Sequence, residues 1–430
     1  PSGKRGNFPH GTPVLQAARS LGVDLDSVCG GRGICARCQV IHTTGEFSKH
    51  GLVSAATHLS PFDATEEKLV RKTTRLKSGR RLGCTAQILG DCVIDVPPES
   101  QIHRQVVRKE AEIREIKIDP VVRLYYVEVE PPKMEDPTSD IRRLLKALET
   151  EWELQKIKVP HSILEMLQPT LREGKWKVTV AVDHDGIMRG IWSDFREHLY
   201  GIAVDIGSTT LAAHLCELGS GEVLSSAGMM NPQIRFGEDL MSRVSYVMLN
   251  QEGEKELTKS VREALNQLSL EVCEQAGIQK EEVMEMVMVG NPVMHHLVHG
   301  INPVELGGAP FALATDEAII TPASELDLEL HQLARTYTLP CIAGHVGADT
   351  AAMVLAEAPH HQEAITLLVD VGTNAEIVLG NRDRLLAASS PTGPAFEGAQ
   401  ISSGQRAAPG AVERVRIDRK TLEPRFRVIG

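Results

Sequence analysis

The sequence predicts a multidomain protein of mixed α/β and α+β architecture. Its 430 residues exceed what one compact core normally holds, and domain-size statistics favour about three units. Three patterns define them: four cysteines near the start, a short strand and helix segment in the middle, and two copies of an apolar strand followed by a small polar turn. We therefore expect units at 1–98, 121–198 and 199–430, with a linker over 99–120.

The cysteines of the first unit have the spacing of an iron–sulfur site. Cys29, Cys35 and Cys38 lie in the segment SVCGGRGICARCQV, and Cys84 follows after a long excursion. A 2Fe-2S cluster takes four thiolates, and one glycine-rich loop can wrap one side of it while a distant segment supplies the last ligand. The first gap holds five residues, as in adrenodoxin-like ferredoxins. We expect these four residues to ligate a 2Fe-2S cluster.

Two other uses of these cysteines are less favoured. Structural zinc usually draws its thiols from paired Cys-x2-Cys knuckles, and only Cys35 and Cys38 form such a pair. Disulfides stabilise small secreted domains, and a chain of this size does not need them. Cys92 could compete with Cys84, but we expect it to be a buried small residue of the strand DCVIDV.

The composition argues against two classes of partner. The net charge of -11 and pI of 5.8 disfavour nucleic acid, because proteins that bind a phosphate backbone usually present a basic surface. No apolar run reaches the roughly 18 residues of a membrane span, so we expect no membrane partner. We expect a cytoplasmic location, where an oxygen-sensitive cluster and unpaired thiols survive.

One basic cluster stands out in this acidic chain. It consists of Arg71, Lys72, Arg75, Lys77, Arg80 and Arg81. Such a run usually forms the solvated face of a helix. The alternative is a docking patch for an acidic electron donor, because complementary charges accelerate encounter.

The middle unit has the pattern of a small α/β fold. The segment VRLYYVEVEPP alternates as a strand does, and a helix follows with Ile141, Leu144, Leu145 and Leu148 on one face. The segment WKVTVAVDHDGIMRGIW predicts a hairpin around Asp185 and Gly186. No residue here suggests catalysis, so we expect a spacing or docking role.

The third unit begins with a turn suited to phosphate. In YGIAVDIGSTTLAAHL an apolar strand ends at Asp205, and a turn leads into a second strand. Gly207 permits close backbone approach, and Ser208, Thr209 and Thr210 offer hydroxyl and amide donors to phosphate oxygens. Asp205 can hold magnesium through water.

The same pattern recurs in ITLLVDVGTNAEIVLG, with Asp370, Gly372, Thr373 and Asn374 in the equivalent places. One such turn is weak evidence, because many hairpins need only its turn chemistry. Two copies, each between strands, indicate a duplicated α/β domain whose two facing loops hold the phosphates of a nucleotide.

Two further motifs lie between these loops. Asp349, in GADTAA, precedes a helix, and catalysis and simple N-capping are equally compatible with this place. His295, His296 and His299 share a helix face, but no fourth ligand is evident, so we expect buried or helix-face histidines rather than a metal site.

The two turns resemble the phosphate loops of the superfamily that joins acetate and sugar kinases, heat-shock chaperones and actin. Together with the cysteine unit, the motifs NPQIRFGEDLMSRV, VGNPVMHH, GADTAA and GPAFEGAQI resemble the reductive activators of corrinoid proteins over essentially the whole chain. The resemblance implies a β-grasp ferredoxin-like domain, a small α/β middle domain and a duplicated actin-like ATPase domain. We expect the sequence to be part of a longer protein, with an incomplete ATPase domain and unassigned adenosine contacts.

The resemblance also implies an activity. Family members use ATP to reduce Co(II) to Co(I), with one electron from the 2Fe-2S cluster, so the implied cofactors are this cluster, ATP and Mg²⁺. The expected partners are a corrinoid-binding protein or corrinoid methyltransferase subunit and an external donor, either a ferredoxin or a reductase. Asp205, Asp370 and Asp349 are the candidate catalytic carboxylates.

Two other classes of function stay open. An ATP-driven activator of a radical dehydratase would share the ATPase fold, but it generally holds a 4Fe-4S cluster across a dimer. A redox-sensing small-molecule kinase, or a binding module with a nucleotide switch, would share the phosphate loops. The segment SSPTGPAFEGAQISSG is our candidate for sensing the nucleotide or meeting the partner.

Overall fold

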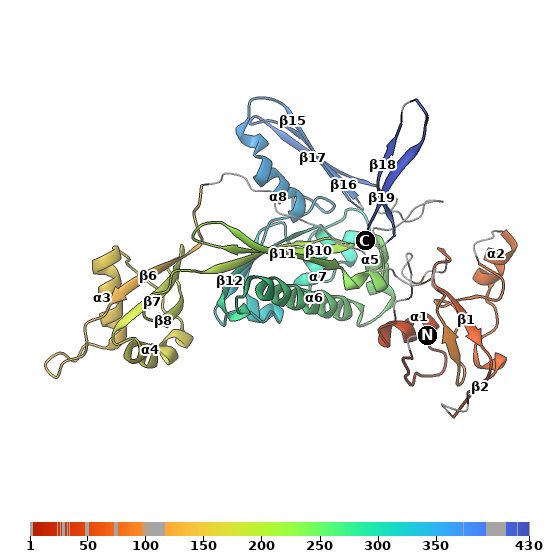
Figure 1. The fold of residues 1–430 in the computed structure, drawn as a ribbon, viewed down its shortest axis with the longest axis horizontal. Coiled ribbons are helices and arrows are strands. Elements are labelled where there is room, and N and C mark those ends of the chain that lie inside the picture. Colours follow the sequence, from red (N-terminus) through yellow and green to blue (C-terminus); the bar gives the residue numbers. More distant parts are fainter. Residues whose placement is uncertain are drawn as a thin grey trace.

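The described residues of the computed structural model form three units that lie in a row (Figure 1). The largest unit is central, and the cysteine-containing unit and the middle unit of the sequence lie at its opposite ends. The structure describes residues 3–23, 25, 27, 31, 33, 35–47, 51–72, 76–97, 100, 117–372, 374–392, 410–418 and 420–429.

The first unit is a small sheet with a helix packed beside it. Strand β1 is the middle strand of an antiparallel sheet of order β4-β1-β5, and β2 and β3 form a separate hairpin. Helix α1 buries Leu15 and Ala18 against Val40 and Leu82 of this sheet. The elements are α1 (Val14–Ser20), β1 (Gln39–Thr43), β2 (Gly45–Phe47), β3 (Leu52–Ser54), α2 (Ala64–Lys72), β4 (Arg81–Leu82) and β5 (Val93–Asp95).

The middle unit has the predicted strands, helix and hairpin. Its antiparallel sheet has the order β6-β7-β8, and the β7–β8 turn contains Gly186 at a φ of 73°. Helix α3 buries Leu144 and Leu148, while Ile141 and Leu145 pack at the edge of the same core. The elements are β6 (Val122–Glu128), α3 (Asp140–Trp152), α4 (His161–Glu173), β7 (Lys177–Asp183) and β8 (Met188–Ser193).

The central unit is built on a six-stranded mixed sheet of order β11-β10-β9-β12-β14-β13. Strands β9, β12 and β14 run parallel, whereas β10 and β11 return antiparallel from β9 as a meander. The elements are β9 (Tyr200–Ile206), β10 (Thr210–Glu217), β11 (Val223–Met230), η4 (Pro232–Arg235), α5 (Leu240–Leu249), α6 (Gly253–Ala276), β12 (Val283–Gly290), α7 (Pro292–Val298), β13 (Ile319–Pro322), β14 (Arg335–Thr338) and α8 (Ala348–Glu357).

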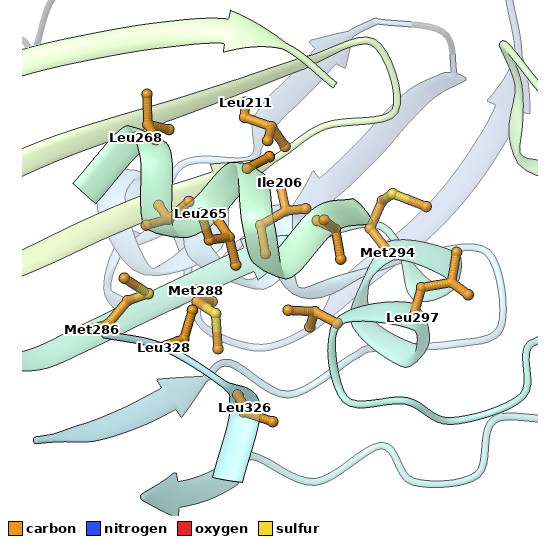
Figure 2. Packing of buried hydrophobic residues seen from close by; sticks show 14 of the residues in the cluster. Ile206, Leu211, Leu265, Leu268, Met286, Met288, Met294, Leu297, Leu326 and Leu328 are labelled. Atoms are coloured by element: carbon orange, nitrogen blue, oxygen red, sulfur yellow. The ribbon is translucent and has the colours of Figure 1, made fainter. Parts of the chain in front are cut away.

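The core of this unit lies between the sheet and α6. Apolar residues recur along α6 at helical spacing, and the face that they form covers the sheet. Figure 2 shows Leu265 and Leu268 of α6 near Ile206 and Leu211 of the sheet. Because β9 and β10 are anchored on this core, the turn between them has a rigid base.

A second meander follows α8. Strands β15 (Thr366–Val371), β16 (Asn374–Gly380) and β17 (Leu385–Pro391) pair antiparallel in that order, as β9, β10 and β11 do. Helix α8 packs against both β12 and β15 and so joins the two meanders. A hairpin of β18 (Val412–Ile417) and β19 (Pro424–Val428) completes the chain (Figure 1). No helix in the described ranges is long and apolar enough to cross a membrane.

Candidate functional site

The first predicted phosphate loop is a tight turn at the end of β9. Asp205 lies in β9, and the amide of Gly207 donates to the carbonyl of Thr210 at 3.0 Å, which closes the turn. Ser208 is buried, while Thr210 begins β10 half-buried. The turn is therefore short and fixed at both ends, as a preorganised anion site requires.

Two Asn-Pro dipeptides hold this loop from behind, and sequence reasoning missed them. Asn231 caps η4 and Asn291 caps α7, each accepting a backbone N–H bond through its side-chain oxygen. The Asn231 side-chain nitrogen donates to the carbonyl of Gly207 at 2.8 Å, and that of Asn291 donates to the Ser208 hydroxyl at 3.0 Å. Each asparagine thus connects the start of a helix to the loop. The Asn-Pro dipeptide, which occurs at both places, was the feature of the sequence that could have indicated this role.

A fully buried arginine also reaches the loop. Arg243 of α5 donates through Nη2 to the carbonyl oxygen of Ser208. It also donates to Gln233 Oε1 at 3.1 Å, to the Gly237 carbonyl at 3.0 Å and to the Met294 sulfur at 2.9 Å. The motif NPQIRFGEDLMSRV therefore forms one structural unit with the first phosphate loop, an arrangement that periodicity alone does not reveal.

The second phosphate loop joins β15 to β16. The amide of Gly372 donates to the carbonyl of Asn374 at 2.8 Å, and the Thr392 hydroxyl donates to the carbonyl of Gly372 at 2.7 Å. Asp370 lies near the end of β15, in the position that Asp205 has in β9. Thr373, a predicted phosphate ligand, and most of the segment SSPTGPAFEGAQISSG lie outside the described residues.

Asp349 lies with the carboxylates of both loops. Burial and, to a smaller extent, the negative charges of Asp205 and Asp370 raise its pKa to about 6. The capping alternative is wrong, because Gly347 is the N-cap of α8. The Asp349 carboxylate accepts from the amide of the next residue, Thr350, at 2.7 Å and from its hydroxyl at 3.4 Å. The structure thus brings the three predicted acids together.

A fourth acid in this group was missed by sequence reasoning. Glu376 of β16 is the direct cross-strand neighbour of Asp370 and is 6% exposed. Burial and then the charges of Asp349 and Asp370 raise its pKa to about 7, while the Ser389 hydroxyl donates to it at 3.2 Å. A glutamate within an apolar strand was the only sequence signal.

This acidic group fits a magnesium ion held through water. Within the described ranges, no three His, Cys, Asp or Glu side chains are arranged to ligate a metal directly. Mg²⁺ usually keeps several waters and binds one or two carboxylates together with phosphate oxygens. Such a cation would reduce the repulsion between like-charged carboxylates, which raise each other's pKa.

The two histidines of α7, His295 and His296, are buried, as expected, and His299, the C-cap of this helix, is half-buried. His296 donates through Nδ1 to the Pro292 carbonyl at 2.8 Å and accepts at Nε2 from the Ala314 amide, while His299 bonds the Thr338 hydroxyl. Burial lowers the pKa of His295 to about 4. These contacts fit neutral packed rings.

The cysteine site is described in part, because Cys29 lies outside the described residues. Cys38 and Cys84 belong to the same buried core, and they and Cys35 are unbridged. A Cβ on Gly33 would lie 2.9 Å from the Thr65 methyl and 3.6 Å from that of Thr85, so the cysteine loop closely approaches the segment of Cys84. Unbridged thiols on two adjoining segments fit a thiolate-ligated cluster.

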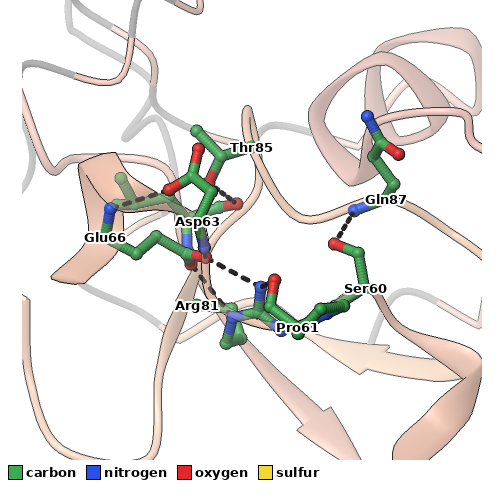
Figure 3. Close-up of polar contacts among 8 residues, drawn as sticks. Ser60, Pro61, Asp63, Glu66, Arg81, Thr85 and Gln87 are labelled. Carbon is green, nitrogen blue, oxygen red and sulfur yellow. Dashed lines mark hydrogen bonds and ion pairs between the residues drawn. The ribbon is translucent and has the colours of Figure 1, made fainter.

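The segment before Cys84 is held by a buried ion pair (Figure 3). Arg81 contacts Glu66 at 2.7 Å, and the same carboxylate accepts from the Leu82 amide at 2.7 Å. The Arg81 guanidinium also bonds the Ser60 carbonyl and stacks on Phe62. Arg81 is therefore not part of a solvated or donor-docking patch, which corrects that assignment for this residue; Arg75 and the side chains of Arg71 and Lys72 lie outside the described residues.

Family models match the chain in succession. The 2Fe-2S iron-sulfur cluster binding domain matches residues 1–88, and the RACo linker region matches 111–198. The RACo middle region matches 200–362, and the C-terminal domain of RACo, the ASKHA domain, matches 364–430. The fold and these matches define a protein in which a 2Fe-2S ferredoxin-type domain is joined to an ASKHA domain, as predicted.

Comparison of the whole given chain with known proteins identifies the family. A solved "Reductive activator for corrinoid,iron-sulfur protein" is 30% identical with a TM-score of 0.67, over 100% of this chain and 68% of that one. "Corrinoid activation enzyme RamQ" of Eubacterium limosum is 30% identical over 94% of this chain and 62% of its own length. The Co(II) methylated amine-specific corrinoid protein reductase of Methanosarcina barkeri is 30% identical over 50% of this chain and 40% of its own length. The chain belongs to the family of reductive activators of corrinoid proteins, and it spans less than two thirds of RamQ.

Proposed function

We propose that this protein uses ATP to drive one electron from its N-terminal domain onto the Co(II) corrinoid of a partner protein, which regenerates Co(I). The observation that carries the proposal is the convergence of both phosphate loops and three aspartates in the same chain as the cysteine unit. The names of the relatives, a corrinoid activation enzyme and a corrinoid protein reductase, support it.

In this proposal the two loops and the acids have separate tasks. The hydroxyls of residues 208–210 and 373, with the amides of these loops other than those of Gly207 and Gly372, hold the phosphates. Asp205 and Asp370 organise Mg²⁺ through water, and Asp349 orients or deprotonates the attacking water. A pKa of about 6 for Asp349 suits that role, because a base is most effective when its pKa lies near the working pH.

The proposed cluster ligands are Cys29, Cys35, Cys38 and Cys84, and the cluster would supply one-electron transfer at low potential. Reduction of the corrinoid is uphill from such a centre. ATP coupling offsets this if the nucleotide favours a complex in which the environment of the cobalt is altered. A ferredoxin or a reductase is the proposed donor, and the cytoplasm is the proposed location.

The decisive experiment is an absorption assay for Co(I). The purified protein, reduced by a low-potential donor, is mixed with a candidate corrinoid protein in the Co(II) state, with and without MgATP. The proposal expects the Co(I) spectrum only with ATP, and not with the Asp205→Asn variant, although that variant keeps the cluster spectrum. Equal formation of Co(I) without ATP, or phosphorylation of a metabolite in its place, contradicts the proposal.

Iron analysis distinguishes the proposed function from that of an activator of a radical dehydratase. Paramagnetic resonance of the reduced protein should show a binuclear centre within one chain. A 4Fe-4S signal shared by two chains would favour an activator of a radical dehydratase, and zinc would exclude electron transfer through these cysteines.

A further inference from the structure

One arginine of the cysteine unit lies against the central unit. Arg19 is near the end of α1, and α1 lies beside α5 in the view of Figure 1. The Arg19 guanidinium carbon is 5.2 Å from the ring centroid of Tyr246 in α5 and 5.7 Å from that of Phe236. These are cation–π distances, so the contact between the two units is charged as well as apolar.

The same arginine is close to two of the candidate cluster ligands. The Leu15 amide of α1 donates to the Gly83 carbonyl at 2.7 Å, and the Gly83 amide donates to the Cys38 carbonyl at 2.7 Å. Arg19 lies one helical turn after Leu15. Burial and the charge of Arg235 lower the pKa of Arg19, whereas Tyr246, Cys38 and Cys84 act in the opposite direction.

Within the described residues, the Arg19 guanidinium does not use all of its hydrogen-bond donors. Its Nε and Nη2 atoms are buried, and they make no hydrogen bond in the part of the chain that the structure describes. A buried cation is stable only when a negative group faces it. A cluster ligated by four thiolates carries a net negative charge that grows on reduction, so it would supply that group at this place.

The residues that Arg19 meets in the central unit lead directly to the first phosphate loop. Phe236 and Tyr246 pack against each other, with ring centroids 4.9 Å apart. Tyr246 follows Arg243 by three residues, so both lie on the same face of α5. Arg243 holds the Ser208 carbonyl, and Asn231 at the other end of this segment holds the loop through Gly207.

We propose that Arg19 is a positioning residue that couples the charge of the cluster to nucleotide occupancy of the first phosphate loop, through residues 231–246. This inference rests on the proposed function, since it needs both a cluster and bound ATP. A reduced cluster and the phosphates of ATP are both anionic, and the first would face Arg19 while the second would lie at the loop that Arg243 holds. Each therefore weakens the other, and the two effects are equal by thermodynamic linkage.

The test is nucleotide affinity in two redox states of the full chain. We expect the reduced protein to bind the non-hydrolysable analogue AMP-PNP about fivefold more weakly than the oxidised protein. By reciprocity, saturating AMP-PNP should lower the midpoint potential of the cluster by about 41 mV for a one-electron couple. In Arg19→Gln both differences should vanish, while the cluster spectrum and the binding of AMP-PNP remain.

Two further variants distinguish coupling from a local charge effect. Tyr246→Leu removes the ring on which Arg19 stacks, and it should abolish the nucleotide dependence without moving the potential of the nucleotide-free protein. Lys68→Gln removes a charge from the exposed surface of α2 and should leave the coupling unchanged. If Arg19→Gln shifts the potential equally with and without AMP-PNP, or if Tyr246→Leu keeps the coupling, the inference is wrong. A wild-type protein with no 2Fe-2S cluster or no nucleotide binding contradicts instead the proposed function.

Discussion

The two phosphate loops share a sequence pattern but differ in what lies behind them. The first is backed by the main core, with Val204 4% exposed, and is tied by Asn231, Asn291 and Arg243. The second follows a strand on which Val369 is 48% exposed, and a hydroxyl from Thr392 supports it. The first loop is therefore a preorganised anchor, whereas the second lies near Asp349 of α8 and Glu376 of β16, whose pKa values are raised.

The largest expected effect tests whether both loops serve one catalytic site. Asp205→Asn and Asp370→Asn should each lower ATP hydrolysis by about 100-fold, because each would remove a charge to which the proposed function assigns the organisation of Mg²⁺. The measurement is steady-state phosphate release at saturating MgATP, with the cluster spectrum as the control for folding. A loss in only one of the two variants would mean that the loops do not act together.

The second prediction concerns the electrostatic strain beside the second loop. A carboxyl whose pKa rises from 3.8 to about 6 on folding destabilises the protein as pH rises through that window, and the full cost is present above pH 6. Asp349→Asn should therefore stabilise the magnesium-free protein by up to about 3 kcal/mol at pH 8 and have no effect below pH 3.8. Urea unfolding at several pH values measures this.

Glu376→Gln tests the same dependence of stability on pH at the second buried carboxyl. Its window lies higher, from 4.5 to about 7, so its stabilisation should appear at higher pH than that of Asp349→Asn. Equal stability of wild type and both variants across this range would show that neither carboxyl has a raised pKa in the folded protein.

A third prediction compares the supports of the two loops. Asn291→Ala removes a helix cap together with a bond to Ser208, and it should cost about 2 kcal/mol and weaken nucleotide binding. Thr392→Val removes one hydrogen bond to the second loop and should cost about 1 kcal/mol. Thermal unfolding and AMP-PNP titration measure both, and a larger loss for Thr392→Val would reverse the comparison.

The smallest expected effect uses equivalent strand positions. Val204 and Val369 each precede the loop aspartate, but only Val204 is buried. Val204→Ala should cost about 1–2 kcal/mol through a cavity, whereas Val369→Ala should stay within about 0.5 kcal/mol. Urea midpoints of the two variants give the comparison, and equal losses would contradict the difference in packing.

Local patterns predicted the parts of the site that are continuous in sequence. The two strand and turn repeats and the hairpin at Gly186 follow from periodicity and turn chemistry. Asn231, Asn291 and Arg243 were missed because they meet the first loop only through the fold. Their roles depend on contacts over 24 to 83 residues of sequence.

Two interpretations of the sequence were wrong because each depended on a contact between residues that are distant in sequence. Arg81 was placed on a basic surface, but a buried partner 15 residues away, Glu66, fixes it inside the first unit. Asp349 was given an equal chance of being a cap, but the N-cap is Gly347, where a Cβ would come within 2.5 Å of the Gly290 carbonyl. The Asp63 and Glu66 capping pair could have shown the first of these in advance.

The hydrogen bonds that hold the first loop also affect which kind of ligand can bind there. The carbonyl oxygens of Gly207, Ser208 and Thr209 all accept hydrogen bonds from Asn231 or Arg243. These three carbonyl oxygens are therefore already used as acceptors, whereas the Ser208, Thr209 and Thr210 hydroxyls can donate. A turn of this kind favours groups that only accept, such as phosphate, over a sodium or potassium ion or an amine, which would need carbonyl oxygens.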